Sequence, residues 1–173
     1  HTVVWVSTPP CDFSGRQADL YFNIDREVAE HYACYIKRRS ACSGVVIIHA
    51  SIPNSVIESL STPDIQTIYW PSAEWKSLIS HCRQGKKLPS ELRKYKTAKL
   101  VIGTICGKPN AVIGSLQSPN EITGQMVLKT SDGRHAVQYV FVGDDGETLL
   151  EESSSVTVFP LTSRQFEAWL ERV

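Results

Sequence analysis

Three polar positions lie inside or at the ends of apolar, strand-like segments, where their side chains could contact a ligand. Gln138 interrupts the apolar run Val137–Phe141, Tyr21 lies in the short run Leu20–Phe22, and Ser7-Thr8 end the first β-branched segment. Amide, phenol and hydroxyl groups can all hydrogen-bond a polar ligand. Each also has an ordinary structural interpretation: an outward polar residue on a half-exposed strand, a core aromatic, and a strand end.

The sequence lacks the familiar motifs for nucleophilic or phosphate-directed chemistry. It has no Gly-x-Ser-x-Gly elbow, no glycine-rich phosphate loop and no His-x-x-x-His pair. Cys82 follows His81 directly, and neighbours in sequence do not face each other on a helix, which disfavours a catalytic Cys/His pair. The acidic run Asp144–Glu147 is interpreted as a solvated hairpin turn.

Charge and hydropathy limit the classes of partner. The 173 residues contain 18 Lys and Arg against 18 Asp and Glu, so no global field attracts a polyanion and long nucleic acid is disfavoured. A local basic patch runs from Lys86-Lys87 to Lys96, and its simplest interpretation is a solvated loop and helix end. No apolar run approaches the roughly 20 residues that span a bilayer, so no membrane partner is expected.

The five cysteines are scattered and odd in number, with no Cys-x-x-Cys pair. This pattern disfavours a disulfide framework and predicts no metal site. It fits a reducing compartment, and we therefore expect an intracellular location, cytoplasmic or nuclear.

Local patterns predict the elements that position these residues. Strands are predicted at 2–8, 20–22, 45–51, 65–70, 100–103, 127–130, 135–142 and 156–159. Helices are predicted after the capping residues Asp25 (or Asn23), Ser72 and Thr162 (or Ser163), with a short one after Pro53. The segment 108–124 is mostly loop. Strands outnumber helices without regular alternation, which indicates an α+β fold in one domain spanning residues 1–173.

Taken in order, these segments resemble the ADP-ribosyltransferase superfamily, and within it the domains labelled DUF3990. The resemblance covers nearly the whole chain. In the first part of the chain, Val4–Thr8 lies where the family has a Tyr-His-Gly-Thr-like strand, Asp12–Gly15 resembles its Asp-Phe-Gly motif, and Leu20–Ala33 resembles its Gly-Phe-Tyr-x-Thr strand with the helix that follows. Further along, Trp75–Arg83 resembles a Trp-containing helix that ends in Asn-Arg, and Leu100–Gly103 resembles an Ile-Val-Ile-Gly strand. Val137–Phe141 resembles the strand that carries the third member of the catalytic triplet.

The resemblance implies a split antiparallel β core with flanking helices, and NAD bound as substrate in a cleft between two sheets. It implies that Gln138 is the catalytic position and holds the ribose, while Tyr21 stacks on nicotinamide. Ser7 or Thr8 would contact the adenosine side, where the family's histidine is matched by Val6.

Two departures from the family pattern bear on activity. Breaking the nicotinamide–ribose bond passes through an oxocarbenium-like state, which a nearby carboxylate stabilises. Gln138 can hydrogen-bond a ribose hydroxyl but carries no charge, and losing one such contact typically lowers the rate about 100- to 1000-fold. Val6 has no polar group at all.

Three hypotheses follow. The first is an NAD-dependent glycosyltransferase that transfers ADP-ribose to a protein or other acceptor, or hydrolyses NAD. The second is a catalytically inactive relative, a pseudoenzyme that acts as a ligand-binding or protein-interaction module. The third is an unrelated α+β domain in which the motif matches are coincidental.

Overall fold

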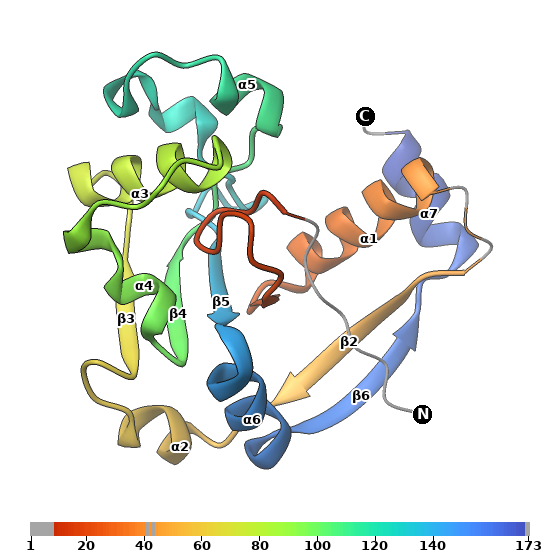
Figure 1. Cartoon of the computed structure of the whole chain (residues 1–173). Helices are drawn as coiled ribbons and strands as arrows, with labels where there is room; N and C mark the ends of the chain where they lie inside the picture. Colours follow the sequence, from red (N-terminus) through yellow and green to blue (C-terminus); the bar gives the residue numbers. More distant parts are fainter. Residues whose placement is uncertain (1–8, 41, 43, 172–173) are drawn as a thin grey trace.

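The computed structural model describes residues 9–40, 42 and 44–171, and it contains two β-sheets (Figure 1). The larger sheet has the strand order β1–β5–β4–β3, and the smaller one pairs β2 with β6. The strands are β1 (Leu20–Asn23), β2 (Val46–Ser51), β3 (Ile65–Ile68), β4 (Leu100–Thr104), β5 (Val137–Phe141) and β6 (Ser155–Pro160). The predicted strand at 2–8, which includes Val6, Ser7 and Thr8, lies outside the described residues.

Helices fill the intervals between these strands, and the α+β class predicted from the sequence is confirmed. The α-helices are α1 (Arg26–Ser40), α2 (Asn54–Ser59), α3 (Ala73–Arg83), α4 (Lys94–Thr97), α5 (Asn110–Gly114), α6 (Gly143–Ser153) and α7 (Ser163–Leu170). Short 3-10 turns occur at Ser90–Leu92, Pro119–Glu121 and Gly124–Met126.

The larger sheet is mixed, which differs from the expected antiparallel core. The pairs β1–β5 and β4–β5 are antiparallel, as is β2–β6, but β3 and β4 run parallel. The reason lies in the connection: α3 and α4 carry the chain back across the sheet between β3 and β4, and such a crossover joins parallel strands.

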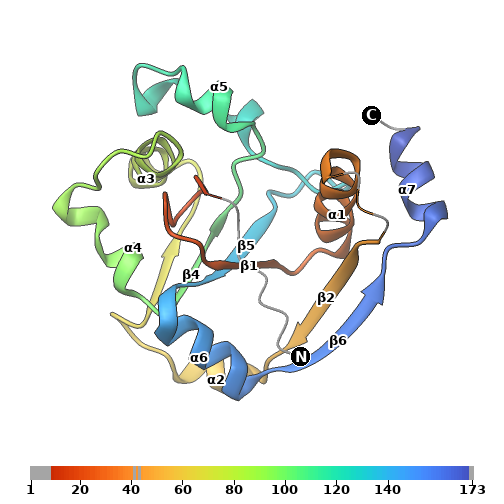
Figure 2. The ribbon, with the colours of Figure 1, turned by 45° about the vertical axis from the view of Figure 1, so that its right-hand side comes forward.

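The two faces of the larger sheet are covered by different elements. One face carries Val101 and Val140, which pack with Trp75, Leu78 and Ile79 of α3. The other face packs against residues of α2, α6 and the end of β2. The β2–β6 pair lies beside this assembly in both views (Figures 1 and 2). Ile47 of β2 and Val45, which directly precedes that strand, pack with α1 and α7.

Because Gly103 of β4 has no side chain, strand β3 and the loop at 11–19 can both pack closely against it on the face that α3 covers. A Cβ atom at this position would lie 2.3 Å from the backbone oxygen of Ile68 and 2.8 Å from Cζ of Phe13. Only a residue without a side chain fits there, so the Phe13 ring, 1% exposed, can reach the sheet. The loop at 11–19 is therefore packed onto this face.

The acidic run Asp144–Glu147 forms the start of helix α6, so the predicted hairpin turn is wrong. Gly143 has φ +58, which turns the chain sharply from β5 into the helix. Gly146 then allows the helix to pack closely, because a Cβ atom there would lie 2.5 Å from the backbone oxygen of Lys99. The buried Leu150 holds α6 on the sheet.

Candidate functional site

The loop between Cys11 and Gly15 forms a tight turn over the larger sheet, and Asp12 is its central polar residue. The Cys11 N–H donates to the Gly15 carbonyl at 3.1 Å, which closes the turn. Asp12 is 3% exposed. A buried carboxylate needs partners to offset the loss of water, and three donors converge on this one.

The donors to Asp12 come from three distant parts of the chain. Arg83, at the end of α3, lies 2.6 Å from Oδ1 through its Nε atom. The backbone N–H of Cys106 and the side-chain Nε2 of Gln138 each donate to Oδ2 at 2.9 Å. The carboxylate therefore ties the loop to α3, to the residues after β4, and to β5.

Arg83 extends this network beyond Asp12. Its Nη2 atom donates to the Cys106 carbonyl at 2.9 Å, and its Nη1 atom donates to the side-chain oxygen of Asn110. Asn110 in turn donates to the Pro10 carbonyl at 3.0 Å. Burial by itself lowers the pKa of Arg83, but the adjacent Asp12 outweighs it, and the pKa lies above its ordinary value. The guanidinium therefore stays charged.

Tyr21 holds the same loop from the neighbouring strand. Its hydroxyl oxygen accepts the backbone N–H groups of Phe13 and Ser14, each at 3.1 Å, and shares a hydrogen bond of 2.9 Å with the Ser14 hydroxyl. Burial raises the pKa of Tyr21 well above its ordinary value, so the phenol is neutral. These contacts make Tyr21 an anchor for the loop backbone.

Gln138 and Tyr21 lie on the same face of the sheet. On β5, Gln138 pairs opposite Asn23, and Tyr21 pairs opposite Val140, so all four side chains project to one side. Gln138 is 6% exposed. The interpretation of Gln138 as an outward polar residue is therefore wrong: the loop covers it, and its amide is directed to Asp12.

Asn23 completes this group with a buried acceptor. Its side-chain oxygen is shielded from solvent and has no hydrogen-bond partner in the described part of the chain. Such an atom costs about 1–3 kcal/mol while it lacks a donor. A hydrogen-bond donor brought to this oxygen would remove that cost.

His81 and Cys82 do not form a catalytic pair. The Nδ1 atom of His81 is 2.8 Å from the carbonyl oxygen of Ser77, one turn back along α3. Burial raises the pKa of Cys82 to about 12, so its thiol is protonated at neutral pH and is a weak nucleophile.

The chemistry available at this site is hydrogen bonding around one ion-paired carboxylate. Asp12 and Arg83 were not identified as site residues from the sequence, because 71 positions separate them. The available signal was the Asp-Phe-Ser-Gly turn itself, where an acidic residue precedes an aromatic one. No group of three or more His, Cys, Asp or Glu side chains within residues 9–40, 42 and 44–171 is arranged to hold a metal ion.

Comparison of the chain with protein-family models, with curated proteins and with solved structures finds no match. The helices that the structure describes include none with the length and apolar character needed to cross a membrane.

Proposed function

We propose that this chain is an ADP-ribosyltransferase-like domain that binds NAD beside Gln138 and Tyr21. The observation that carries the proposal is that these two residues, to which the family resemblance assigns contacts with NAD, share one sheet face with the unpartnered oxygen of Asn23. A ribose hydroxyl is a donor of the kind that Asn23 lacks, and it can also accept or donate at an amide such as Gln138.

In the active form of this proposal, the domain transfers ADP-ribose to a protein or other acceptor, or hydrolyses NAD. The bond between nicotinamide and ribose breaks, and the positive charge that develops on the ribose needs negative charge nearby. Gln138 supplies none. Asp12 is a carboxylate bonded to Gln138, but its charge is balanced by Arg83 at 2.6 Å.

These same contacts favour a second candidate, a catalytically inactive relative that binds a nucleotide or a protein. Gln138 is buried and its amide already donates to Asp12, so it serves the fold whether or not a substrate is present. The inactive form requires no further charge at the site. As a nucleotide-binding module it predicts binding of NAD or ADP-ribose without release of nicotinamide, and as a protein-binding module it predicts binding of neither.

Calorimetry with NAD and with ADP-ribose tests the binding step, and incubation with labelled NAD tests turnover. We expect Asn23→Ala to weaken NAD binding about tenfold, since a hydrogen bond in a buried site contributes roughly 1.4 kcal/mol. Tyr139→Phe is the matched control, because Tyr139 lies beside Gln138 on β5 but on the opposite face. Absence of heat with both ligands would refute the proposal, and labelled product would decide for the active form.

A further inference from the structure

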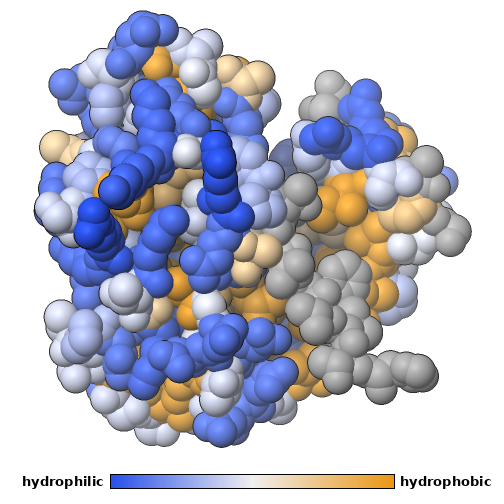
Figure 3. Space-filling model, viewed as in Figure 1, coloured by the Kyte–Doolittle hydropathy of each residue, from blue (hydrophilic) through white to orange (hydrophobic). Residues whose placement is uncertain are grey.

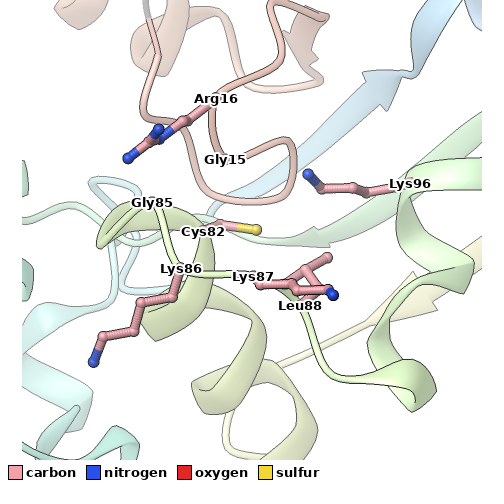
Figure 4. A pocket seen from close by; sticks show the side chains of 8 residues that line it. All are labelled: Gly15, Arg16, Cys82, Gly85, Lys86, Lys87, Leu88 and Lys96. Atoms are coloured by element: carbon pink, nitrogen blue, oxygen red, sulfur yellow. The ribbon is translucent and has the colours of Figure 1, made fainter.

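A second polar feature lies on the outer side of the same loop. A pocket of about 280 Å³ is bordered by the turn at Gly15 and Arg16, by the segment that follows α3, and by α4 (Figure 4). Its charged lining residues are Arg16, Lys86, Lys87 and Lys96. Strongly hydrophilic side chains also cover much of the molecular face on which the loop, α3 and α4 lie (Figure 3).

The four cations of this basic pocket form no ion pair with a carboxylate in the part of the chain that the structure describes. No carboxylate of the described residues lines the pocket. Asp19 interacts electrostatically with Lys96, but it is buried and does not line the pocket. Nearby lysines are paired: Lys94 lies 2.9 Å from Glu74, and Lys99 lies 3.0 Å from Asp64.

Stabilisation of the C-terminal end of α3 does not account for the four cations of the basic pocket. Cations often follow a helix because they complement its C-terminal carbonyl groups. Here the Gly85 N–H already donates to the Cys82 carbonyl at 3.1 Å, and the Lys86 N–H donates to the His81 carbonyl at 2.9 Å. Arg16 and Lys96 come from other segments, so a helix-end role cannot explain why they border the same pocket.

The guanidinium of Arg16 lies close to the backbone of Gly85. Gly85 has φ +65, and a Cβ atom there would lie 3.0 Å from Nε and 3.4 Å from Nη2 of Arg16. The guanidinium therefore lies directly over the glycine. The adjacent Cys82 is buried and neutral, so the pocket floor adds no negative charge that would offset the cations above it.

We propose that the basic pocket binds a small molecule that carries two adjacent phosphate groups. Arginine binds phosphate oxygens through two parallel N–H bonds, and lysine supplies point charges around it. The pocket has room for such a group, and its four cations match the larger negative charge of a diphosphate better than that of a single phosphate. This proposal does not depend on NAD binding at Gln138.

Titration calorimetry with inorganic pyrophosphate at low salt tests the proposal on the full chain. We expect Arg16→Gln and Lys96→Gln each to weaken binding about tenfold or more, since each removes a charge-assisted contact. Lys94→Gln is the matched control: it removes the same charge from the same helix, but Lys94 is paired with Glu74 and lies outside the pocket. It should change the affinity less than about twofold.

These measurements distinguish binding in the basic pocket from nonspecific attraction to positive charge and from binding at the proposed NAD site. Equal weakening by Lys94→Gln and Lys96→Gln, or the absence of binding, would overturn the proposal. Inorganic phosphate binding as tightly as pyrophosphate would refute the requirement for two groups. Asn23→Ala, which changes the proposed NAD site and not the basic pocket, should leave the pyrophosphate affinity unchanged, and a loss of pyrophosphate binding in this variant would contradict a separate site. Thermal unfolding of each variant without ligand checks that it folds.

Discussion

Replacing Gln138 by glutamate would place a second carboxylate beside a buried one. The amide of Gln138 donates to Oδ2 of Asp12 at 2.9 Å, and the two residues are 6% and 3% exposed. Glutamate has nearly the same shape but, when ionised, cannot donate. Under the proposed function this substitution would supply the missing carboxylate of the catalytic position, and it should destabilise the fold.

The size of this loss of stability depends on whether the new carboxylate stays charged beside Asp12 or becomes protonated. Two charges at about 3 Å repel by about 6 kcal/mol at an effective dielectric constant of about 20. Protonating a glutamate at pH 7 costs only about 3.7 kcal/mol, because its ordinary pKa is about 4.3 and each pH unit corresponds to 1.36 kcal/mol. Protonation is the cheaper route, and the positive charge of Arg83 offsets part of the repulsion. We expect Gln138→Glu to lower the free energy of unfolding by about 2–4 kcal/mol at pH 7.

The loss should shrink as the pH falls. The folded protein raises the pKa of the new carboxyl above its unfolded value, so the folded state binds the extra proton and the penalty grows as the pH rises above about 4.3. At pH 5 the protonation cost is only about 1 kcal/mol, and the protonated carboxyl can donate to Asp12.

Urea unfolding of the wild type, Gln138→Glu and Gln138→Leu at pH 5, 6 and 7 measures this dependence. Differences are taken at the same pH, so that the titration of other groups cancels. Gln138→Leu removes the bond to Asp12 without adding charge, and its loss should change little with pH. A Gln138→Glu loss that is the same at pH 5 and pH 7 would refute the reasoning.

Three further substitutions test contacts elsewhere in the fold. Gly103→Ala should destabilise the protein by about 3 kcal/mol in urea unfolding, because the added Cβ would lie 2.3 Å from a backbone oxygen of β3. Tyr21→Phe should lower the free energy of unfolding by about 1–3 kcal/mol and speed hydrogen exchange in the loop, since two buried N–H groups lose their acceptor. The control substitution Tyr139→Phe should change both measurements little. His31 accepts a hydrogen bond from Trp169 at 3.1 Å, and burial lowers the pKa of His31. The folded state therefore binds a proton at His31 less readily than the unfolded state does. As the pH falls below about 6.5, the wild type should lose stability relative to His31→Leu, which thermal unfolding measures.

Elements with local signals could be predicted from the sequence. Helix α3 begins after Ser72, whose hydroxyl accepts the Trp75 N–H at 3.1 Å, and α7 begins after Thr162 with a capping box to Gln165. These caps use residues three positions apart, so a short window contains the whole signal. The sequence does not indicate helix α6, because Asp145-Gly146 also fits a turn and the contacts that Gly146 makes with Lys99 and Phe141 come from outside the helix.

The site itself could be predicted only in part, because its burial depends on a chain of distant contacts. Gly103 has no side chain, so the Phe13 ring can reach the sheet, and this packing buries the adjacent Asp12. A buried carboxylate must be paired, and removing one partner of such a pair typically costs about 3–5 kcal/mol. Arg83 and Gln138 are therefore drawn to Asp12, and Gln138 becomes a buried donor. Strand alternation could show that Gln138 shares a face with Val140, but no local pattern could show that a loop more than 100 residues earlier covers that face.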